Sequence, residues 1–206
     1  MKILLNQVGK RYQQHWVFKG LDYTFEPHGN YAILGSNGSG KSTLLRILAG
    51  MQHANKGTLQ YQLSGKDIAP EKIFSFVSYC APGMDIIEEM SLTEFLTFHF
   101  TFKKILPGFD VKKIIDAIGL QGVSHKFIHD FSSGMKQRVK LAQAFFTDAP
   151  LLLLDEPCSN LDLQGVATYQ EWLKAYSNNR LVIIASNDER EYEGVSDMIS
   201  MQDYKG

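Results

Sequence analysis

The sequence has few of the features that mark secreted, membrane-spanning or nucleic-acid-binding proteins. Its two cysteines, Cys80 and Cys158, lie far apart and in no metal-binding spacing, which indicates a reducing compartment. No apolar run approaches the roughly 18 residues of a membrane-spanning helix, and the first residues turn polar too early for a secretory signal. The net charge of −1 argues against a basic surface for nucleic acid. These absences predict a soluble, cytoplasmic protein without a nucleic-acid partner.

The length and the apolar content fit a folded domain with a sizeable core. With 206 residues, of which 44% are apolar, the chain suits one domain or a core with an inserted lobe. Residues 3–8 and 17–25 flank a polar turn and predict a β-hairpin, and residues 57–62 and 74–79 predict two further short strands.

A glycine-rich stretch, residues 35–43, lies between an apolar strand at 31–34 and a predicted helix at 44–49. Its spacing matches the phosphate-binding P-loop, in which backbone N–H groups and a helix N-terminus surround phosphate oxygens. Lys41 is expected to reach the β- and γ-phosphates, and the Ser42 hydroxyl to ligate Mg²⁺. A flexible Gly/Ser loop is the alternative, but it does not explain Lys-Ser-Thr at a helix start. The predicted nucleotide-binding residues here are Gly35, Ser36, Asn37, Gly38, Ser39, Gly40, Lys41, Ser42 and Thr43.

Two further apolar runs end in polar side chains. Residues 151–154 are four leucines followed by Asp155 and Glu156, and residues 181–185 lead into the polar segment 186–188. Ligands of open α/β sheets bind at the carboxyl ends of the strands, and a buried charge without a partner is costly. Given a P-loop in the same chain, Asp155 is expected to ligate Mg²⁺ and Glu156 to take a proton from the attacking water.

The composition changes between residues 84 and 146, where helical patterns replace strands. Ser91 and Glu94 match a capping box at the start of one helix, and Asp110 is placed to cap a second helix that ends at Gly119. We interpret this block as a helical lobe inserted into an α/β core.

Two other groups of side chains have both a structural and a functional interpretation. His125 and His129 are four residues apart, which fits either a helix face with a metal or a solvated loop, and the nearby glycine and serine favour the loop. Tyr12, Trp16 and Phe18 lie near the hairpin turn, where one ring is placed to stack on a nucleobase and strand packing accounts for the others.

Two stretches on either side of the acid pair complete a specific set of motifs. Phe131-Ser132-Ser133-Gly134-Met135-Lys136-Gln137-Arg138 precedes Asp155 by about 20 residues, and residues 157–162 follow Glu156. Together with the P-loop, they resemble the LSGGQ signature and the D-loop of the ATP-binding cassette (ABC) family, and the resemblance covers nearly the whole chain. Tyr12 falls where this family stacks its adenine. A P-loop alone is shared by many NTPases, whereas these motifs in this order are specific.

The resemblance implies a single ABC ATPase domain over residues 1–206. The implied fold is α/β: a P-loop NTPase with a mostly parallel RecA-like core sheet, an N-terminal antiparallel β part and an inserted α-helical lobe at about 84–146. ATP and Mg²⁺ are expected between the P-loop of one cassette and Ser132, Ser133 and Gly134 of a second cassette, in a homodimer or heterodimer. A separate membrane-spanning permease is the implied partner, at the inner face of the cell membrane. The implied function is that of the ATP-hydrolysing subunit of an ABC transporter.

Two positions depart from the family pattern. The family usually has a glutamine after the strand predicted at 74–79, where this chain has Cys80, Ala81 and Pro82 with no glutamine nearby. Asn187 stands where the family has its switch histidine, and we expect it to contact the γ-phosphate as a catalytic residue. Because Glu156 is present, the protein is expected to be an ATPase, although a slow one.

Two alternatives stay open at the level of the sequence. A nucleotide-gated regulatory module with little hydrolysis fits the changes at Cys80 and Asn187. A non-transport ABC ATPase acting on DNA or the ribosome usually carries two cassettes, a coiled coil or a basic surface, and this sequence shows none of these.

Overall fold

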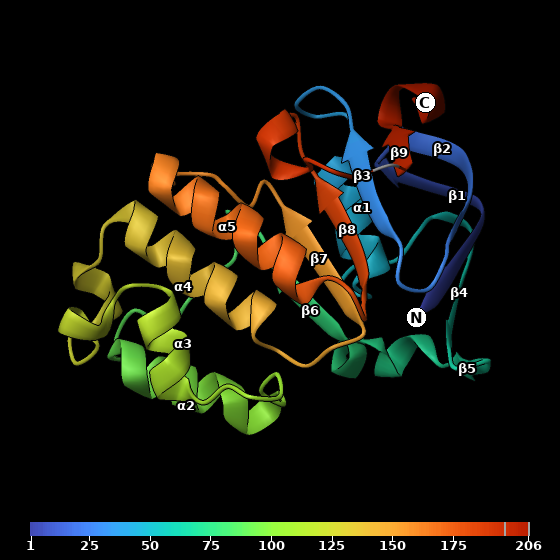
Figure 1. Ribbon diagram of the computed structural model, residues 1–206. Coiled ribbons are helices and arrows are strands. Elements are labelled where there is room, and N and C mark those ends of the chain that lie inside the picture. The colour runs from blue at the N-terminus through green and yellow to red at the C-terminus, as the bar shows by residue number, and fades with distance from the viewer. Residues whose placement is uncertain (196, 206) are drawn as a thin grey trace.

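The computed structural model describes residues 1–195 and 197–205. In these residues the strands form one antiparallel and one parallel sheet, which share a hydrophobic core around helix α1 (Figure 1). The antiparallel sheet has the order β2-β1-β4-β5, with β1 (Lys2–Tyr12), β2 (His15–Phe25), β4 (Lys56–Leu63) and β5 (Lys66–Ile68). The parallel sheet has the order β6-β7-β8-β3-β9, with β6 (Val77–Cys80), β7 (Leu151–Asp155), β8 (Leu181–Ala185), β3 (Asn30–Leu34) and β9 (Asp197–Ser200). The expected α/β fold, with its antiparallel N-terminal part, is confirmed.

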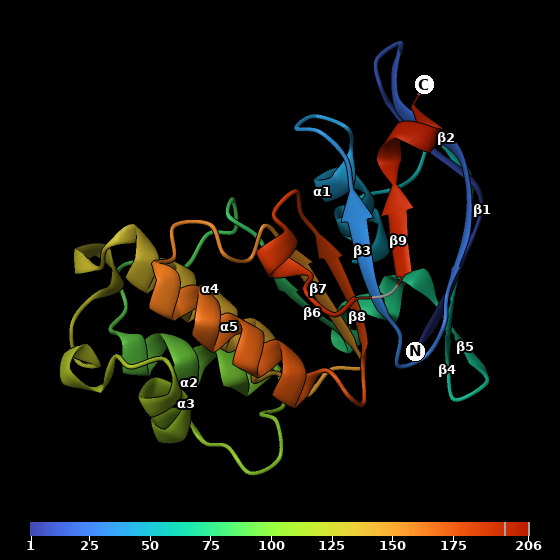
Figure 2. The same ribbon diagram turned by 45° about the horizontal axis from the view of Figure 1, so that its top comes forward.

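The parallel sheet is buried on both faces because its central strands are apolar throughout. Along β7, Leu151 and Leu153 pack in the core shared with α1 (Lys41–Leu48) and the antiparallel sheet, whereas Leu152 and Leu154 pack in the core shared with the other helices. This alternation is the period of two of an extended strand, and a doubly covered sheet explains the uninterrupted leucine run. Helices α4 (Ser133–Phe145) and α5 (Leu163–Tyr176) lie across the second face, with α2 (Leu92–Phe102) and α3 (Val111–Ala117) beside them (Figure 2).

The connection between the neighbouring strands β6 and β7 holds α2, α3 and α4. Two predicted caps set the first two of these helices. Ser91 Oγ accepts the Glu94 N–H at 3.3 Å while the Glu94 carboxylate accepts the Ser91 N–H at 2.9 Å, which is the capping box predicted for α2. The Asp110 carboxylate accepts the Lys113 N–H at 2.8 Å at the start of α3. The helical lobe is therefore confirmed as part of the fold, while its boundaries at 84–146 and the single-domain assignment stay predictions.

The histidines of this connection occupy the predicted loop. His125 lies in a turn, and His129 lies in a separate 3-10 helix, Ile128–Asp130, where its ring stacks on Phe127. They share no helix face. Among the described residues, no group of three or more His, Cys, Asp or Glu side chains is arranged to hold a metal ion.

The strand predicted at 74–79 is wrong in its first half. Residues Pro70–Phe76 form a 3-10 helix, and β6 begins only at Val77. Pro70 is placed at the start of this helix, where its fixed φ and missing N–H are tolerated. Ile73 is buried against Gly50, whereas 66% of Phe74 is exposed. The alternation of aromatic and polar residues at 74–76 therefore resembles a strand pattern, although these residues do not form a strand.

Candidate functional site at the carboxyl edge of the parallel sheet

The P-loop connects the end of β3 to α1 at the carboxyl edge of the parallel sheet (Figure 1). Its path requires glycine at two positions. Gly40 has φ +103°, and a Cβ there would lie 2.7 Å from Val17 Cγ1. Gly35 has φ +148°, and a Cβ there would lie 2.5 Å from Ser39 Oγ. At these two positions the backbone path of the loop therefore leaves no room for a side chain.

Lys41 is the first residue of α1 and folds back into the loop. Its Nζ donates to the Gly35 carbonyl at 2.5 Å and to the Ser36 carbonyl at 3.4 Å, and only 5% of the residue is exposed. Burial lowers the pKa of the Lys41 ammonium, while the carboxylates of Glu156 and Asp155 oppose this shift. The buried Lys41 ammonium thus lies beside the start of α1, where the first backbone N–H groups of the helix have no partner within it.

Asp155 and Ser42 form a polar pair directly behind the loop. Asp155 ends β7, and its Oδ1 accepts the Ser42 hydroxyl at 3.0 Å although only 3% of the residue is exposed. Burial raises the pKa of Asp155, and the hydrogen bond from Ser42 opposes that rise. A hydroxyl and a carboxylate are hard oxygen donors of the kind that Mg²⁺ prefers, so the residues present fit this ion.

Glu156 leaves the strand in a strained backbone conformation. Its φ is +42°, a region that residues other than glycine rarely adopt, and its N–H donates to the Ala185 carbonyl of β8 at 2.9 Å. This turn places Glu156 in the wall of a hollow of about 390 Å³. The other residues that line the hollow are Tyr12, Val17, Asn37, Gly38, Gly40, Lys41, Ser42 and Thr43.

Tyr12 enters the same hollow from the end of β1, opposite His15 of β2. It is 48% exposed, and its hydroxyl accepts the Gln52 amide at 2.7 Å, which keeps the ring beside the P-loop. Val17, which the sequence analysis did not single out, touches Gly40 and shares this wall. Its only signal in the sequence is its place in the alternating pattern of the hairpin. The hollow thus combines an exposed ring, an apolar patch and a phosphate-type loop.

The end of β8 contacts the P-loop through Asn187. The Asn187 Nδ2 donates to Asn37 Oδ1 at 3.0 Å, so the residue at the expected switch position lies within reach of the loop. Ser186 accepts the Asp188 N–H at 2.8 Å and fixes the turn that presents Asn187. The Asn187 side chain is exposed and neutral, unlike the buried Lys41 and Asp155.

No glutamine follows β6 in the sequence, but the side chain of a glutamine from α4 lies beside the end of this strand. Cys80 is fully buried, and burial raises the pKa of its thiol to about 12, which makes it an inert core residue. Gln137 of α4 lies with its Nε2 at 3.9 Å from Cys80 Sγ and donates to the Pro157 carbonyl at 2.7 Å. Pro82 accepts Lys140 Nζ at 2.6 Å through its carbonyl. The departure from the family pattern after β6 therefore stands, and Gln137 reaches Cys80 only because α4 packs against this strand.

The signature residues lie away from the P-loop of their own chain. Ser132 caps α4, its hydroxyl accepting the Met135 N–H at 3.3 Å, and Ser133 is exposed at the start of that helix. Gly134 approaches the neighbouring loop so closely that a Cβ would lie 2.9 Å from the Asn160 carbonyl. Both views show this start of α4 well apart from the loop between β3 and α1 (Figures 1 and 2). None of the three lines the hollow beside the P-loop.

A larger hollow of about 750 Å³ lies at the opposite edge of the parallel sheet. Residues such as Phe74, Phe102, Asp148 and Arg180 line it, near the amino ends of β6, β7 and β8. It contains none of the predicted site residues. Size alone therefore does not mark the candidate site, whereas the convergence of Lys41 with the acid pair does.

The fold and this convergence define a P-loop nucleotide-binding protein of the α/β class. The family profile described as ABC transporter matches residues 18–159 of the chain. Among curated proteins, the chain is 32% identical to the uncharacterized ABC transporter ATP-binding protein YybJ of Bacillus subtilis, over 94% of the chain and 86% of that protein. It is 33% identical to the cytochrome c biogenesis ATP-binding export protein CcmA of Xanthomonas axonopodis, over 78% of the chain and 74% of that protein.

Other relatives are longer than this chain. The sulfate/thiosulfate import ATP-binding protein CysA of Mesostigma viride is 28% identical over 97% of the chain, which spans 58% of that protein. A solved ATP-binding subunit of an ABC transporter superposes with a TM-score of 0.82 at 21% identity, over 97% of this chain and 85% of that one. The chain belongs to the ABC transporter family, as an ATP-binding protein of the P-loop ATPase type. In residues 1–195 and 197–205, no helix has the length and apolar character needed to cross a membrane.

Proposed function

We propose that the protein is the ATP-hydrolysing subunit of an ABC transporter and drives a separate membrane-spanning permease. The observation that carries this proposal is the hollow in which Tyr12, the P-loop and Glu156 meet beside the buried Asp155–Ser42 pair. It offers a ring for the base, amides and an ammonium for the phosphates, and a carboxylate for a water. We place the protein at the inner face of the membrane, bound to the permease and without a nucleic-acid partner.

The P-loop side of the site binds the substrate in this proposal. Lys41 Nζ, now on the carbonyls of Gly35 and Ser36, turns to the β- and γ-phosphates, and the free N–H groups at the start of α1 surround them. The Tyr12 ring stacks on adenine. Ser42 and Asp155 hold Mg²⁺, which neutralises the charge of the phosphate oxygens when it is bound.

Glu156 acts as the general base of the hydrolysis. Its backbone turn holds the carboxylate at the carboxyl end of β7, next to Asp155 and Lys41, where an attacking water meets the γ-phosphate. The Glu156 carboxylate takes a proton from that water as the oxygen–phosphorus bond forms and the bond to the leaving ADP oxygen breaks. Asn187 donates a hydrogen bond to a γ-phosphate oxygen, exchanging its present partner Asn37.

The place of the signature supports the proposed dimerisation. Ser132, Ser133 and Gly134 lie at an exposed helix start and away from their own P-loop, so a second cassette supplies them to the ATP. Backbone N–H groups at the start of α4 then meet the γ-phosphate from the other side. ATP holds two cassettes together, and its hydrolysis removes the charge that both bind.

The variant Glu156→Gln tests this proposal. Glutamine keeps the shape of the side chain but accepts no proton, so ATP binding proceeds while hydrolysis stalls. Size measurement with Mg-ATP is expected to show a persistent dimer for Glu156→Gln and a transient one for the parent. Glu171→Gln, at an exposed position of α5, is the matched control. A variant that remains monomeric at saturating Mg-ATP would argue against the two-cassette site.

A second function, a nucleotide-gated module with little hydrolysis, has one observation in its favour. The residue that contacts the P-loop from the end of β8 is the neutral Asn187, which brings a hydrogen-bond donor but no positive charge. Steady-state ATP turnover, with and without membrane vesicles that contain the permease, separates the two functions. Turnover that remains near background in both cases favours the module.

A further inference from the structure

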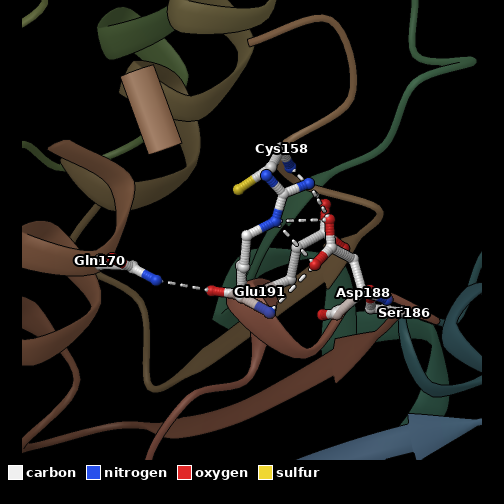
Figure 3. A network of polar contacts seen from close by, with 6 residues as sticks. Cys158, Gln170, Ser186, Asp188 and Glu191 are labelled. Atoms are coloured by element: carbon white, nitrogen blue, oxygen red, sulfur yellow. Dashed lines mark hydrogen bonds and ion pairs between the residues drawn. The ribbon is translucent and has the colours of Figure 1, made fainter. Parts of the chain in front are cut away.

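Glu191 is a buried acidic residue outside the predicted site that contacts the loop carrying Glu156. It lies in a short 3-10 helix after β8, Glu189–Glu191, and only 4% of the residue is exposed. Its Oε1 accepts the Cys158 N–H at 2.7 Å. Since Cys158 lies two residues after Glu156, this hydrogen bond joins the segment after β8 to the segment after β7 (Figure 3).

Packing alone does not account for a glutamate at this place. Burial raises the pKa of Glu191, although the Ser186 hydroxyl and the Cys158 amide oppose the rise. Its second carboxylate oxygen, Oε2, has no hydrogen-bond partner among the described residues. Removing a carboxyl group from water in this way is unfavourable, and an apolar side chain of similar size would avoid that cost.

The backbone that carries the Glu191 carboxylate is fixed by hydrogen bonds. The buried Tyr169 hydroxyl of α5 donates to the Glu191 carbonyl at 2.6 Å, and the Glu191 N–H donates to the Asp188 carbonyl at 3.0 Å. Gln170 of the same helix donates to the neighbouring Arg190 carbonyl at 3.1 Å (Figure 3). Helix α5 therefore holds the carboxylate in place from behind.

The turn that receives this hydrogen bond contains the strained backbone of Glu156. A positive φ at a residue other than glycine persists only where the surrounding structure fixes it, and here φ is +42°. Two backbone hydrogen bonds contribute, from Glu156 N–H to Ala185 O at 2.9 Å and from Ser159 N–H to Glu156 O at 3.1 Å. The Glu191 carboxylate adds a side-chain restraint between these two.

We propose that Glu191 is a positioning residue that holds the turn at 156–159 through the Cys158 amide and thereby aims the Glu156 carboxylate. The inference rests on the proposed role of Glu156 as the base. Without the acceptor the Cys158 N–H is left unpaired and the strained turn relaxes. Because a shift of about 1 Å in a reacting group costs on the order of 100-fold in rate, we expect Glu191→Ala to lower kcat about 10-fold or more. The KM for ATP is expected to change less than about 2-fold, since the P-loop contacts are untouched.

Three variants isolate the hydrogen bond. Glu191→Ala removes the acceptor, Glu191→Gln keeps an oxygen acceptor of the same length, and Glu189→Ala changes an exposed acid of the same 3-10 helix. We expect turnover within about 3-fold of the parent for Glu191→Gln and for Glu189→Ala, because both keep the bond to Cys158. Should Glu191→Ala not fold, Glu191→Met removes the acceptor while filling the space.

Hydrogen exchange of the Cys158 amide gives a readout that does not depend on hydrolysis. We expect faster exchange in Glu191→Ala than in the parent, with Glu191→Gln close to the parent. A parent without ATP turnover would contradict the proposed function, and the exchange rates would then still decide whether Glu191 holds the turn. Equal exchange in the parent and Glu191→Ala would overturn the inference. So would a loss of turnover in Glu191→Gln as large as in Glu191→Ala, or equal changes in kcat and KM.

Discussion

The side chains at the ends of β3 and β7 differ in burial and charge from those at the ends of β6 and β8, although the four strands alternate in the same sheet. After β3 and at the end of β7, Lys41 and Asp155 are buried and make hydrogen bonds within the site. After β6 the Pro82 carbonyl accepts a hydrogen bond from Lys140 Nζ, and after β8 the exposed, neutral Asn187 contacts the P-loop. The charged residues that line the hollow beside the P-loop, Lys41 and Glu156, thus follow the first pair of strand ends. The two pairs of strand ends therefore carry different parts of the proposed chemistry.

We infer that binding and proton transfer belong to β3 and β7, whereas β8 only assists the transition state. A buried, partnered charge is expensive to remove, because its partner is left uncompensated. An exposed neutral amide contributes one hydrogen bond of ordinary strength. Substitutions at the two pairs should therefore differ in magnitude and in the step that they affect.

The largest effect on ATP binding is expected from Lys41→Ala. Lys41 supplies the mobile cation of the phosphate-binding loop, and a charged hydrogen bond contributes about 1.5–3 kcal/mol, so ATP affinity should fall about 100-fold. Calorimetric titration with Mg-ATP measures this, with the exposed Lys19→Ala of β2 as the control. Equal affinity for Lys41→Ala and the parent would remove the distinction between the two pairs of strand ends.

A smaller effect, on turnover alone, is expected from Asn187→Ala. Loss of one donor to the transferring group should slow turnover by about 10-fold or more, with little change in ATP affinity. Asn187→His should retain activity, because the ring supplies a donor at the same place. Asn178→Ala, an exposed asparagine at the far edge of the sheet, is the control. An Asn187→Ala protein as fast as the parent would show that this residue does not touch the γ-phosphate.

No effect on turnover is expected from His99→Gln, which lies in α2 outside both pairs of strand ends. Burial, with a smaller contribution from Lys103, lowers the pKa of His99 to about 4 from 6.5. The unfolded chain therefore binds the proton more readily. The contribution of neutral His99 to the free energy of unfolding is therefore complete above pH 6.5. It is lost as the pH falls towards 4, and the loss amounts to at most about 3 kcal/mol.

Urea unfolding of the parent and His99→Gln between pH 7 and pH 4 measures this contribution. The parent should lose more stability over this range than His99→Gln, and the exposed His53→Gln should follow the parent. Identical pH dependence of the parent and His99→Gln would contradict the pKa assigned to this histidine.

The sequence predicted much of the fold because local patterns and tertiary burial agree in most segments. The hairpin, the four-leucine strand and the caps at Ser91 and Asp110 lie where their patterns placed them. The failure at 74–76 arose because an aromatic alternation with a period of two also fits a short 3-10 helix that begins at Pro70. The contact of Ile73 with Gly50 favours the 3-10 helix, and it is not local in sequence.

The residues of the candidate site also divide into those that the sequence predicted and those that it did not. The P-loop residues and the acid pair follow from motif spacing, since one short stretch carries each of them. Glu191 and Gln137 could not be found from the sequence, because Glu191 lies in an acidic run typical of a solvated surface and Gln137 lies on a polar-looking helix. Their roles depend on hydrogen bonds to Cys158 and Pro157, which only the packing of α4 and α5 brings within reach.

In the proposed mechanism, Glu156 takes the proton from water at an ATP site built by β3 and β7. Single-turnover hydrolysis by the parent, Glu156→Gln and Asn187→Ala, with ATP affinity measured on the same samples, tests it most directly. We expect similar affinity for all three, a chemical step slower by about 100-fold or more in Glu156→Gln, and one slower by about 10-fold in Asn187→Ala. A Glu156→Gln protein that hydrolyses bound ATP at the parent rate would contradict the claim.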